Sequence, residues 1–464
     1  MKSLTEKLLV LIAIFSAPLS SLFWIPSAEV LAHGLIYPWP NNSLMMWEFA
    51  NSYLYSWVSI IGLGSLNTEP SAFLNFTYSF LAIGIAGNSH VGQAFFLYLG
   101  FVVCMGGMYV LTQTLGFSKS ASIAAGVFYI FSPMVMSGMP IEITNIRLLP
   151  FYAATPILFN FCVRSIDSPG KRDLALFGIF SIILGSAGYT GLQFFVLHLI
   201  LICTYILLKL FSLKPFKVRV ATLSQSFYLL VIMFLINLYW LSPLFLDLSG
   251  SYAARTEPGY SDIDILRGLS VNIIDGFRML PYPEQANISP WVAYYYHPVA
   301  TLVVFSLIMI GIFALLNHDT KKMAMYPGIL LIISLFLTKG LKEPFSSLGE
   351  FVFLSSPYVT RLFRNPTYLE ILVVFAFSLL IGLGIGELVR TSSRKPKKYL
   401  IMTVVAVTAL FVIFGWQFLI GGPLISSQAE LSSAQSVEVP IYFNDFADFL
   451  HEDPATYRVL SVPT

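Results

Sequence analysis

Apolar runs of membrane-spanning length recur along almost the whole sequence of 464 residues. Roughly 20 apolar residues cross the hydrocarbon of a bilayer, which is about 30 Å thick. The composition agrees, because 56% of the residues are hydrophobic and only 11% are charged, which no soluble globular protein shows. The sequence therefore predicts an all-α polytopic membrane protein with about 11 transmembrane helices. We place them at 7–25, 91–113, 121–139, 147–163, 174–187, 191–211, 223–244, 298–316, 324–338, 367–389 and 399–420.

The distribution of charge predicts how these spans are oriented, because Lys and Arg gather in short cytoplasmic connections. With an odd number of spans and a cytoplasmic N-terminus, the C-terminal tail is extracytoplasmic, as are 19 of the 24 carboxylates. On this topology 17 of the 26 Lys and Arg residues are cytoplasmic: Lys2, Lys7, Lys119, Arg164, Lys171, Arg172, Lys209, Lys214, Lys217, Arg219, Lys321, Lys322, Arg390, Arg394, Lys395, Lys397 and Lys398.

The apolar stretch 70–87 competes to be a twelfth span. Counting it would invert every later connection and place the basic cluster RKPKK at 394–398 outside. We therefore assign 26–90 to one long extracytoplasmic loop with amphipathic or re-entrant helices at the interface, a depth that suits its aromatic side chains. Further outer loops are 245–297 and 339–366. The first apolar run is longer than a signal peptide's usual 7–15 residues or so, which favours a retained span.

The domain organisation follows from this topology. Residues 1–420 form the transmembrane domain with its outer loops, and residues 421–464 form an extracytoplasmic tail. The tail has the pattern of an amphipathic helix followed by a strand, YRVLSV at 457–462. A single strand has no partners. Either it pairs with an outer loop, or the tail is the start of a truncated soluble domain, which we favour.

Two arginines precede the late apolar run, in the stretch RLFRNPTYLE at 361–370. Arg361 and Arg364 can share a helix face, but Pro366 makes Asn365 extended and indicates a turn into the span. The arginines can be anchors whose heads reach the interface. Alternatively, they bind the phosphate of a lipid, since one guanidinium can donate hydrogen bonds to two phosphate oxygens at once. Outer arginines beside a span run against the usual charge bias, which favours the second interpretation.

Arg147 is a second outer basic residue, at the start of the span 147–163. Ionisable groups at such a depth are hypotheses for function, usually with a partner. Glu142 and Glu370 are the candidate partners. A structural ion pair and a contact to substrate remain equally open.

Outer carboxylates supply candidate general bases, which must lie within hydrogen-bond reach of the hydroxyl they deprotonate. Glu29 and Glu48 in the first outer loop are the leading candidates, and His33 lies near them as a substrate-binding candidate. Other outer carboxylates are Asp262, Asp264 and Asp275. Metal ligation is poorly supported, since DID at 262–264 alone is a weak signal. The sequence lacks a phosphate-binding loop of the ATPase type and a basic patch suited to nucleic acid.

The sequence as a whole resembles the integral-membrane glycosyltransferases of the GT-C fold, especially the arabinofuranosyltransferase D type and uncharacterised prokaryotic relatives. The resemblance covers about 450 residues. It is carried by GLIYP at 34–38 after the first span, by SIAAGVFYIFSP at 122–133, by RLLPFYAATPILF at 147–159, by LFRNPTYLE at 362–370 and by YRVLSVP at 457–463.

The resemblance implies transfer of a sugar from a polyprenyl-phosphate donor to a cell-envelope glycan or glycoconjugate on the extracytoplasmic side. Arg364 matches the late F-R-x-P element of the family and is expected to contact the donor phosphate. The family tends to carry an acidic base after the first span, where this chain has Leu35. Glu29 or Glu48 would then substitute for it, or the chain would lack catalysis.

Two other classes of function stay open. A flippase or transporter of lipid-linked sugars also needs many spans, but it should place charged residues near the bilayer midplane, where this sequence has almost none. A non-catalytic membrane scaffold subunit would agree with Leu35. For the glycosyltransferase we expect the bilayer, the lipid-linked donor and a glycan acceptor as partners, no nucleic acid, no required cofactor and an optional divalent cation.

Overall fold

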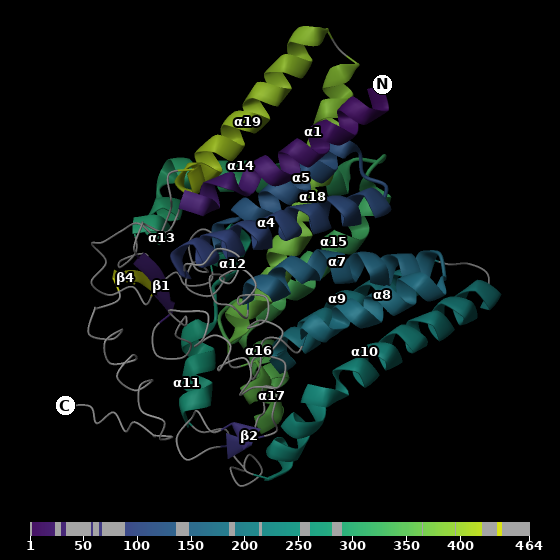
Figure 1. The fold of residues 1–464 in the computed structure, drawn as a ribbon, viewed down its shortest axis with the longest axis vertical. Coiled ribbons are helices and arrows are strands. Elements are labelled where there is room, and N and C mark those ends of the chain that lie inside the picture. Colours follow the sequence, from purple (N-terminus) through teal and green to yellow (C-terminus); the bar gives the residue numbers. More distant parts are fainter. Residues whose placement is uncertain are drawn as a thin grey trace, which may run out of the picture.

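The structure is a computed structural model that describes residues 2–23, 29–33, 57–58, 65–66, 89–135, 148–184, 191–212, 216–250, 260–280, 290–363, 365–394, 396–419 and 434–438. These residues form a bundle of long helices with shorter helices gathered at one end (Figure 1). In Figure 1, α18 runs through the middle of the bundle, between α1 and α19 at one edge and α8 and α10 at the other.

The long helices coincide with the predicted spans, since each of the eleven predicted ranges overlaps one of them. Six of the described helices are long and apolar enough to cross a membrane, within α4, α9, α10, α14, α15 and η5–α18. The prediction of a multi-span helical protein is confirmed, and the count of eleven stays a prediction. The helices are α1 (Lys2–Ser16, continued by the 3-10 turn η1, Ala17–Phe23), α4 (Ser89–Thr114), α5 (Lys119–Phe131), α7 (Leu148–Asp167), α8 (Lys171–Ser181), α9 (Gly191–Ser212), α10 (Phe216–Gly250), α14 (Pro298–Leu316), α15 (Lys321–Thr338), α18 (Glu370–Ser393) and α19 (Lys397–Leu419).

Short elements occupy the predicted outer loops. The loops 245–297 and 339–366 hold α11 (Tyr260–Leu269), α12 (Ile273–Arg278), α13 (Pro290–Tyr296), α16 (Ser346–Phe353) and α17 (Pro357–Leu362), and the 3-10 turn η5 (Pro366–Leu369) enters α18. In the loop 26–90, where we expected interface helices, the described stretches are strands: β1 (Glu29–His33), β2 (Trp57–Val58) and β3 (Ser65–Leu66). Their backbone groups are satisfied by antiparallel pairing, between β2 and β3 and between β1 and a C-terminal strand.

That C-terminal strand is β4 (Ala434–Glu438), and its pairing with β1 bears on the topology. Glu29 lies opposite Glu438 and His33 opposite Ala434. Two paired strands must lie on the same side of any membrane that the helices cross. An even number of crossings therefore separates them, which agrees with the ten spans predicted between 91 and 420. The tail strand predicted at 457–462 lies outside the described residues.

The centre of the bundle is α18, whose residues 370–385 are all buried by neighbouring helices. Helices associate closely in membranes through small residues, because lipid chains provide no hydrophobic drive between them. Gly382 fills this role: a Cβ there would lie 2.7 Å from the carbonyl oxygen of Ala121 and 2.8 Å from the Cβ of Ala125. Both belong to α5, so the glycine allows α18 and α5 to approach.

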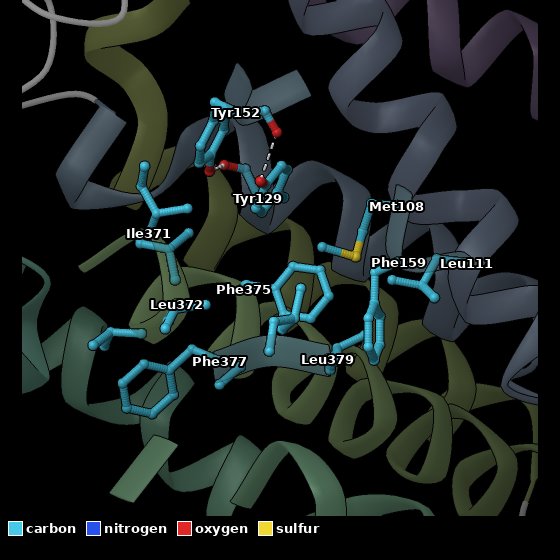
Figure 2. Packing of buried hydrophobic residues seen from close by; sticks show 14 of the residues in the cluster. Met108, Leu111, Tyr129, Tyr152, Phe159, Ile371, Leu372, Phe375, Phe377 and Leu379 are labelled. Atoms are coloured by element: carbon cyan, nitrogen blue, oxygen red, sulfur yellow. Dashed lines mark hydrogen bonds between the residues drawn. The ribbon is translucent and has the colours of Figure 1, made fainter. Parts of the chain in front are cut away.

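A tyrosine pair joins α5 to α7 beside this helix, as Figure 2 shows. The rings of Tyr129 and Tyr152 stack with centroids 4.1 Å apart. The Tyr129 hydroxyl donates to the Tyr152 carbonyl at 2.9 Å, and the Tyr152 hydroxyl donates to the Tyr129 carbonyl at 2.6 Å. Each buried hydroxyl thus has an acceptor, as buried polar groups require. The ring of Phe375 meets Tyr129 edge-on, which ties the pair to α18.

Candidate functional site

The two ends of the bundle differ in their ionic contacts. At one end, α18 finishes with Arg390, which pairs with Glu387 and with Asp319 in the α14–α15 connection. At the same end Lys209 lies 2.8 Å from Asp167, and Arg164 lies 3.1 Å from Asp173. All these basic residues are among those predicted to be cytoplasmic. The other end, where α18 begins and α15 finishes, holds the candidate site.

The short helix α12 carries the first of the site residues. Local contacts define where this helix begins and ends. The side chain of Asn272 caps it by accepting from the Asp275 backbone N–H at 2.9 Å, and it also donates to the Asp275 carboxylate. Met279 ends the helix in the left-handed conformation at φ 59°. Met279 and Leu280 are fully buried, and the ring of Phe277 lies 6.2 Å from that of Phe377 in α18. These contacts fix α12 against the start of α18.

Four polar side chains meet where α12, α13 and α18 converge, and we call Asp275, Arg278, Tyr296 and Glu370 the outer polar cluster. Arg278 Nη1 lies 3.4 Å from Asp275 Oδ1. The guanidinium also lies over the ring of Tyr296, 5.1 Å from its centroid. Glu370, the first residue of α18, is fully buried, and its carboxylate interacts electrostatically with Asp275.

The charged groups of the cluster shift the pKa of the Tyr296 hydroxyl. Burial raises the pKa of its hydroxyl, and the negative charges of Asp275 and Glu370 raise it further, while Arg278 acts in the opposite direction. The phenol is therefore neutral at physiological pH and remains a hydrogen-bond donor.

Lys339 organises the turn that follows α15. Its ammonium group donates to the carbonyls of Lys342 at 2.8 Å, Phe345 at 3.2 Å and Gly340 at 3.3 Å. Burial lowers the pKa of this ammonium, and the nearby Glu343 partly offsets that effect. The turn also meets Ser270, whose hydroxyl oxygen accepts from the Leu341 N–H at 3.0 Å. Lys339 thus fixes the start of the segment that carries α16, α17 and the two candidate arginines.

The entry into α18 has the predicted form. Asn365 is outside the helical region, at φ −114° and ψ 85°, and its side chain accepts from the Thr367 N–H at 3.2 Å. Arg361 lies in the last turn of α17, which ends at Leu362, and its side chain lies outside the described residues. Arg364 follows the end of that helix and also lies outside them. The end of α17 before Arg364 agrees with the turn that Pro366 indicates.

The remaining predicted site residues are only partly described. Glu29 and His33 occupy the two ends of β1, where the structure describes the backbone alone. Glu48 and Arg147 lie outside the described residues. The roles of the predicted site residues therefore stay predictions. Within the described ranges, no group of three or more His, Cys, Asp or Glu side chains is placed to hold a metal ion.

Sequence reasoning missed Arg278 and Tyr296 as site residues. A signal for Arg278 was present, because it is an outer arginine close to a span and lies three residues after Asp275. That spacing places the two side chains on one face of a helix. Tyr296 had no such signal, since its place in the cluster depends on how α13 packs.

An apolar cavity of about 460 Å³ opens between α4, α7 and the end of α8. It lies beside the first turn of α7, directly after Arg147 in the sequence. Its walls carry almost no polar surface, so it suits an apolar occupant. The lining residues are Phe96, Gly100, Val103, Leu149, Pro150, Ala153, Ala154, Ile157, Ile179, Phe180, Ile182 and Ile183.

Comparison with solved structures shows the same fold elsewhere. The arabinofuranosyltransferase AftD from Mycobacteria superposes with a TM-score of 0.62 over 95% of this chain, at 13% identity. A mutant form of that protein gives a TM-score of 0.61 at 13% identity, also over 95% of this chain. This chain spans 28% and 30% of the length of these two structures. The oligosaccharyltransferase of Archaeoglobus fulgidus is more distant, with a TM-score of 0.45 over 91% of this chain and 57% of its own, at 11% identity.

No curated protein matches the sequence. A family match, by contrast, covers residues 45–464, which is most of the chain, and it includes α4 to α19 and the outer polar cluster. The family is described as the N-terminal GT-C domain of alpha-(1→3)-arabinofuranosyltransferase. The resemblance inferred from the sequence is thereby confirmed, and the chain belongs to this family of GT-C glycosyltransferase domains.

Proposed function

We propose that this chain is a membrane glycosyltransferase that transfers a sugar from a polyprenyl-phosphate donor to a cell-envelope glycan or glycoconjugate on the extracytoplasmic side. The observation that carries the proposal is the GT-C family match over residues 45–464. The fold shared with AftD supports it. The description of the family names an arabinofuranosyltransferase, so an arabinofuranosyl group is the first donor sugar to test.

The donor phosphate is held by arginines in this proposal. Arg361 and Arg364 precede α18, and Arg147 precedes α7. A guanidinium forms two charge-assisted hydrogen bonds to phosphate oxygens, which positions the phosphate as well as binding it. His33 at the end of β1 is a further substrate-binding candidate.

The reaction is an inverting displacement at the anomeric carbon of the donor sugar. An acceptor hydroxyl attacks this carbon, and the bond between the carbon and the phosphate oxygen breaks. Glu29 or Glu48 takes the proton of the hydroxyl. The lipid phosphate leaves with the bonding electrons, and the arginines stabilise the charge that develops on it. Atoms and charge balance without a cofactor, and a divalent cation remains compatible with the scheme.

The apolar cavity beside α7 supports a lipid-linked donor. Its lining is apolar from α4 through α8 and it begins next to Leu149 and Pro150, two residues beyond Arg147. An isoprenoid chain that occupies it would gain the hydrophobic contribution of burial. The phosphate would then lie at the mouth of the cavity, near the arginine.

A transfer assay tests the proposal. Membranes containing the chain are supplied with a radiolabelled polyprenyl-phosphate arabinofuranose and an acceptor oligosaccharide, and released polyprenyl phosphate is measured together with labelled product. Wild-type membranes should release both in equal amounts. Loss of the general base should lower kcat by about 10²–10⁴-fold. Turnover that stays complete in both Glu29→Gln and Glu48→Gln would show that neither residue is the base.

The control for these variants is Glu350→Gln, which removes an exposed carboxylate on α16. Its turnover should equal that of the wild type. Release of polyprenyl phosphate without labelled glycan would indicate hydrolysis of the donor rather than transfer, and would contradict the proposed acceptor.

One observation favours a second function. Leu35 stands where the family tends to carry an acidic residue. A non-catalytic membrane subunit would bind the lipid-linked donor without consuming it. The same assay separates the two functions, because such a subunit would retain the labelled donor on purification and release no polyprenyl phosphate.

A further inference from the structure

Buried polar atoms without hydrogen-bond partners gather in the outer polar cluster. Within the described part of the chain, both carboxylate oxygens of Glu370 and the Nε of Arg278 are buried and form no hydrogen bond. Glu370 has no exposed surface at all. A buried carboxyl group without hydrogen-bond donors is strongly destabilising, so this group calls for an occupant that the described residues do not provide.

The unpaired atoms restrict what the occupant can be. The Glu370 oxygens accept hydrogen bonds, whereas the Arg278 Nε–H donates one. A metal cation would satisfy the carboxylate and leave the Nε–H without an acceptor. A phosphate would satisfy the Nε–H, but it would be repelled by Asp275 and would offer the Glu370 oxygens no hydrogen-bond donor. A group that both donates and accepts, such as an alcohol, satisfies the two kinds of atom together.

The cluster also offers aromatic faces beside its polar atoms. The Arg278 guanidinium lies 5.1 Å from the centroid of Tyr296 and 5.9 Å from that of Phe305 in α14. Sugar rings combine apolar C–H faces with hydroxyl edges, so they match a site of this composition. Tyr296 is only half-buried and the Arg278 side chain keeps 17% of its surface exposed, which leaves the cluster open on one side.

We propose that Glu370, Asp275, Arg278 and Tyr296 bind the hydroxyl groups of one sugar unit of the acceptor glycan. The charge of the cluster supports an acceptor over a donor: Asp275 offsets the single guanidinium, so no net positive charge is left to hold the phosphate of the lipid-linked donor. This inference rests on the proposed function for its biological meaning, whereas the binding itself can be measured without turnover.

Direct binding provides the first test. The full chain is reconstituted in nanodiscs and titrated with a synthetic α-arabinofuranosyl oligosaccharide, with a maltooligosaccharide of equal length as the comparison. Binding is followed by saturation-transfer NMR. The arabinofuranosyl probe should bind to the wild type, and Glu370→Gln and Tyr296→Phe should each weaken it about tenfold, because Gln replaces one acceptor oxygen by an amide donor and Phe lacks the hydroxyl. Glu350→Gln should leave binding unchanged.

Kinetics provide the second test, because a merely structural role would not separate the two substrates. In the transfer assay, Tyr296→Phe should raise the KM for the acceptor about tenfold and leave the KM for the lipid-linked donor unchanged. Thermal unfolding of each variant identifies any loss of folding. Tyr296→Phe removes only a hydroxyl and keeps the ring, so it keeps the test decisive if Glu370→Gln fails to fold.

Three outcomes would overturn the inference. Wild-type chain that binds no saccharide would mean that the cluster holds only water. A calcium-induced rise in the unfolding temperature that disappears in Glu370→Gln, without saccharide binding, would identify a cation site. Equal saccharide binding by the wild type and by both cluster variants would place the sugar elsewhere. If saccharide binds as expected but no transfer occurs, the proposed catalytic function fails while the site stands.

Discussion

Arg390 holds Glu387 through two hydrogen bonds, from Nε to Oε2 and from Nη2 to Oε1, each 2.7 Å long. The same guanidinium reaches Asp319 in the α14–α15 connection. The last turn of α18 is therefore tied to two neighbouring helices at the lysine-rich end of the bundle. At the opposite end, within the described residues, buried polar atoms of Glu370 and Arg278 in the outer polar cluster have no hydrogen-bond partner.

The contact of Asp319 with Arg390 predicts a pH dependence of stability. Hydrogen bonding to Arg390, with its positive charge, holds the pKa of Asp319 below its ordinary value of 3.8. A lowered folded-state pKa means that the contribution is fully present above 3.8 and is lost as the pH falls below it. Asp319→Asn should therefore lower the unfolding temperature more at pH 7 than at pH 3, because the contribution is lost as the pH falls through the folded-state pKa. A difference of equal size at both pH values would contradict this account, with Glu350→Gln as the control.

The arginines before α18 should govern the affinity for the donor. Arg361→Gln and Arg364→Gln each remove charge-assisted hydrogen bonds worth about 1.5–3 kcal/mol, which corresponds to a loss of about 10–150-fold in kcat/KM for the lipid-linked sugar. The lysine variants should recover only part of this, since an ammonium group lacks the planar fork. The control is Arg267→Gln on α11, an exposed outer arginine. Unchanged kinetics in both glutamine variants would show that the arginines only anchor the helix.

Close packing of α18 predicts a stability defect at Gly382. In Gly382→Ala the new Cβ would meet the Ala121 carbonyl oxygen at 2.7 Å, so the helices must separate. Overpacking of this kind costs about 1–3 kcal/mol. The unfolding temperature in detergent should fall clearly. Gly106→Ala is the matched control, because its Cβ would have ordinary contact with Ile14 at 3.8 Å. Equal unfolding temperatures for the two variants would argue against tight packing of α5 on α18.

Cysteine labelling tests the predicted topology. Replacement of Cys104, Cys162 and Cys203 by alanine gives a background free of native thiols. On that background, Glu350→Cys should react with a membrane-impermeant maleimide in intact cells, whereas Lys397→Cys should react only after permeabilisation. Both positions are exposed in the structure. The reverse pattern would place the outer polar cluster in the cytosol and contradict the proposed side of transfer.

The helices and their alternation could be predicted from the sequence, because both depend on local properties. Length and apolar content determine a span. The pairing of Glu29 with Glu438 agrees with the even number of spans that the distribution of Lys and Arg predicts between them. The departure of Asn365 from helical backbone was predictable as well, since Pro366 restricts the residue before it.

The candidate site was less predictable because it depends on tertiary packing. Asp275 and Glu370 were recognised as outer acidic residues, but they are 95 positions apart and nothing local indicated that they meet. The role of Lys339 likewise depends on the turn after α15, whose carbonyl groups fold back onto the Lys339 ammonium group. The strands of the first outer loop were also missed, because β1 is determined by a partner some 400 residues away.

The central claim is that the arginines before α18 hold the phosphate of a lipid carrier. The most direct measurement is a cryo-electron microscopy structure of the chain in nanodiscs with bound polyprenyl phosphate. The account predicts a phosphate at the outer end, within about 2.7–2.9 Å of the guanidinium nitrogens of Arg361 or Arg364, with the isoprenoid chain along α7. A phosphate bound at the lysine-rich end, or both guanidinium groups turned away from any lipid, would contradict it.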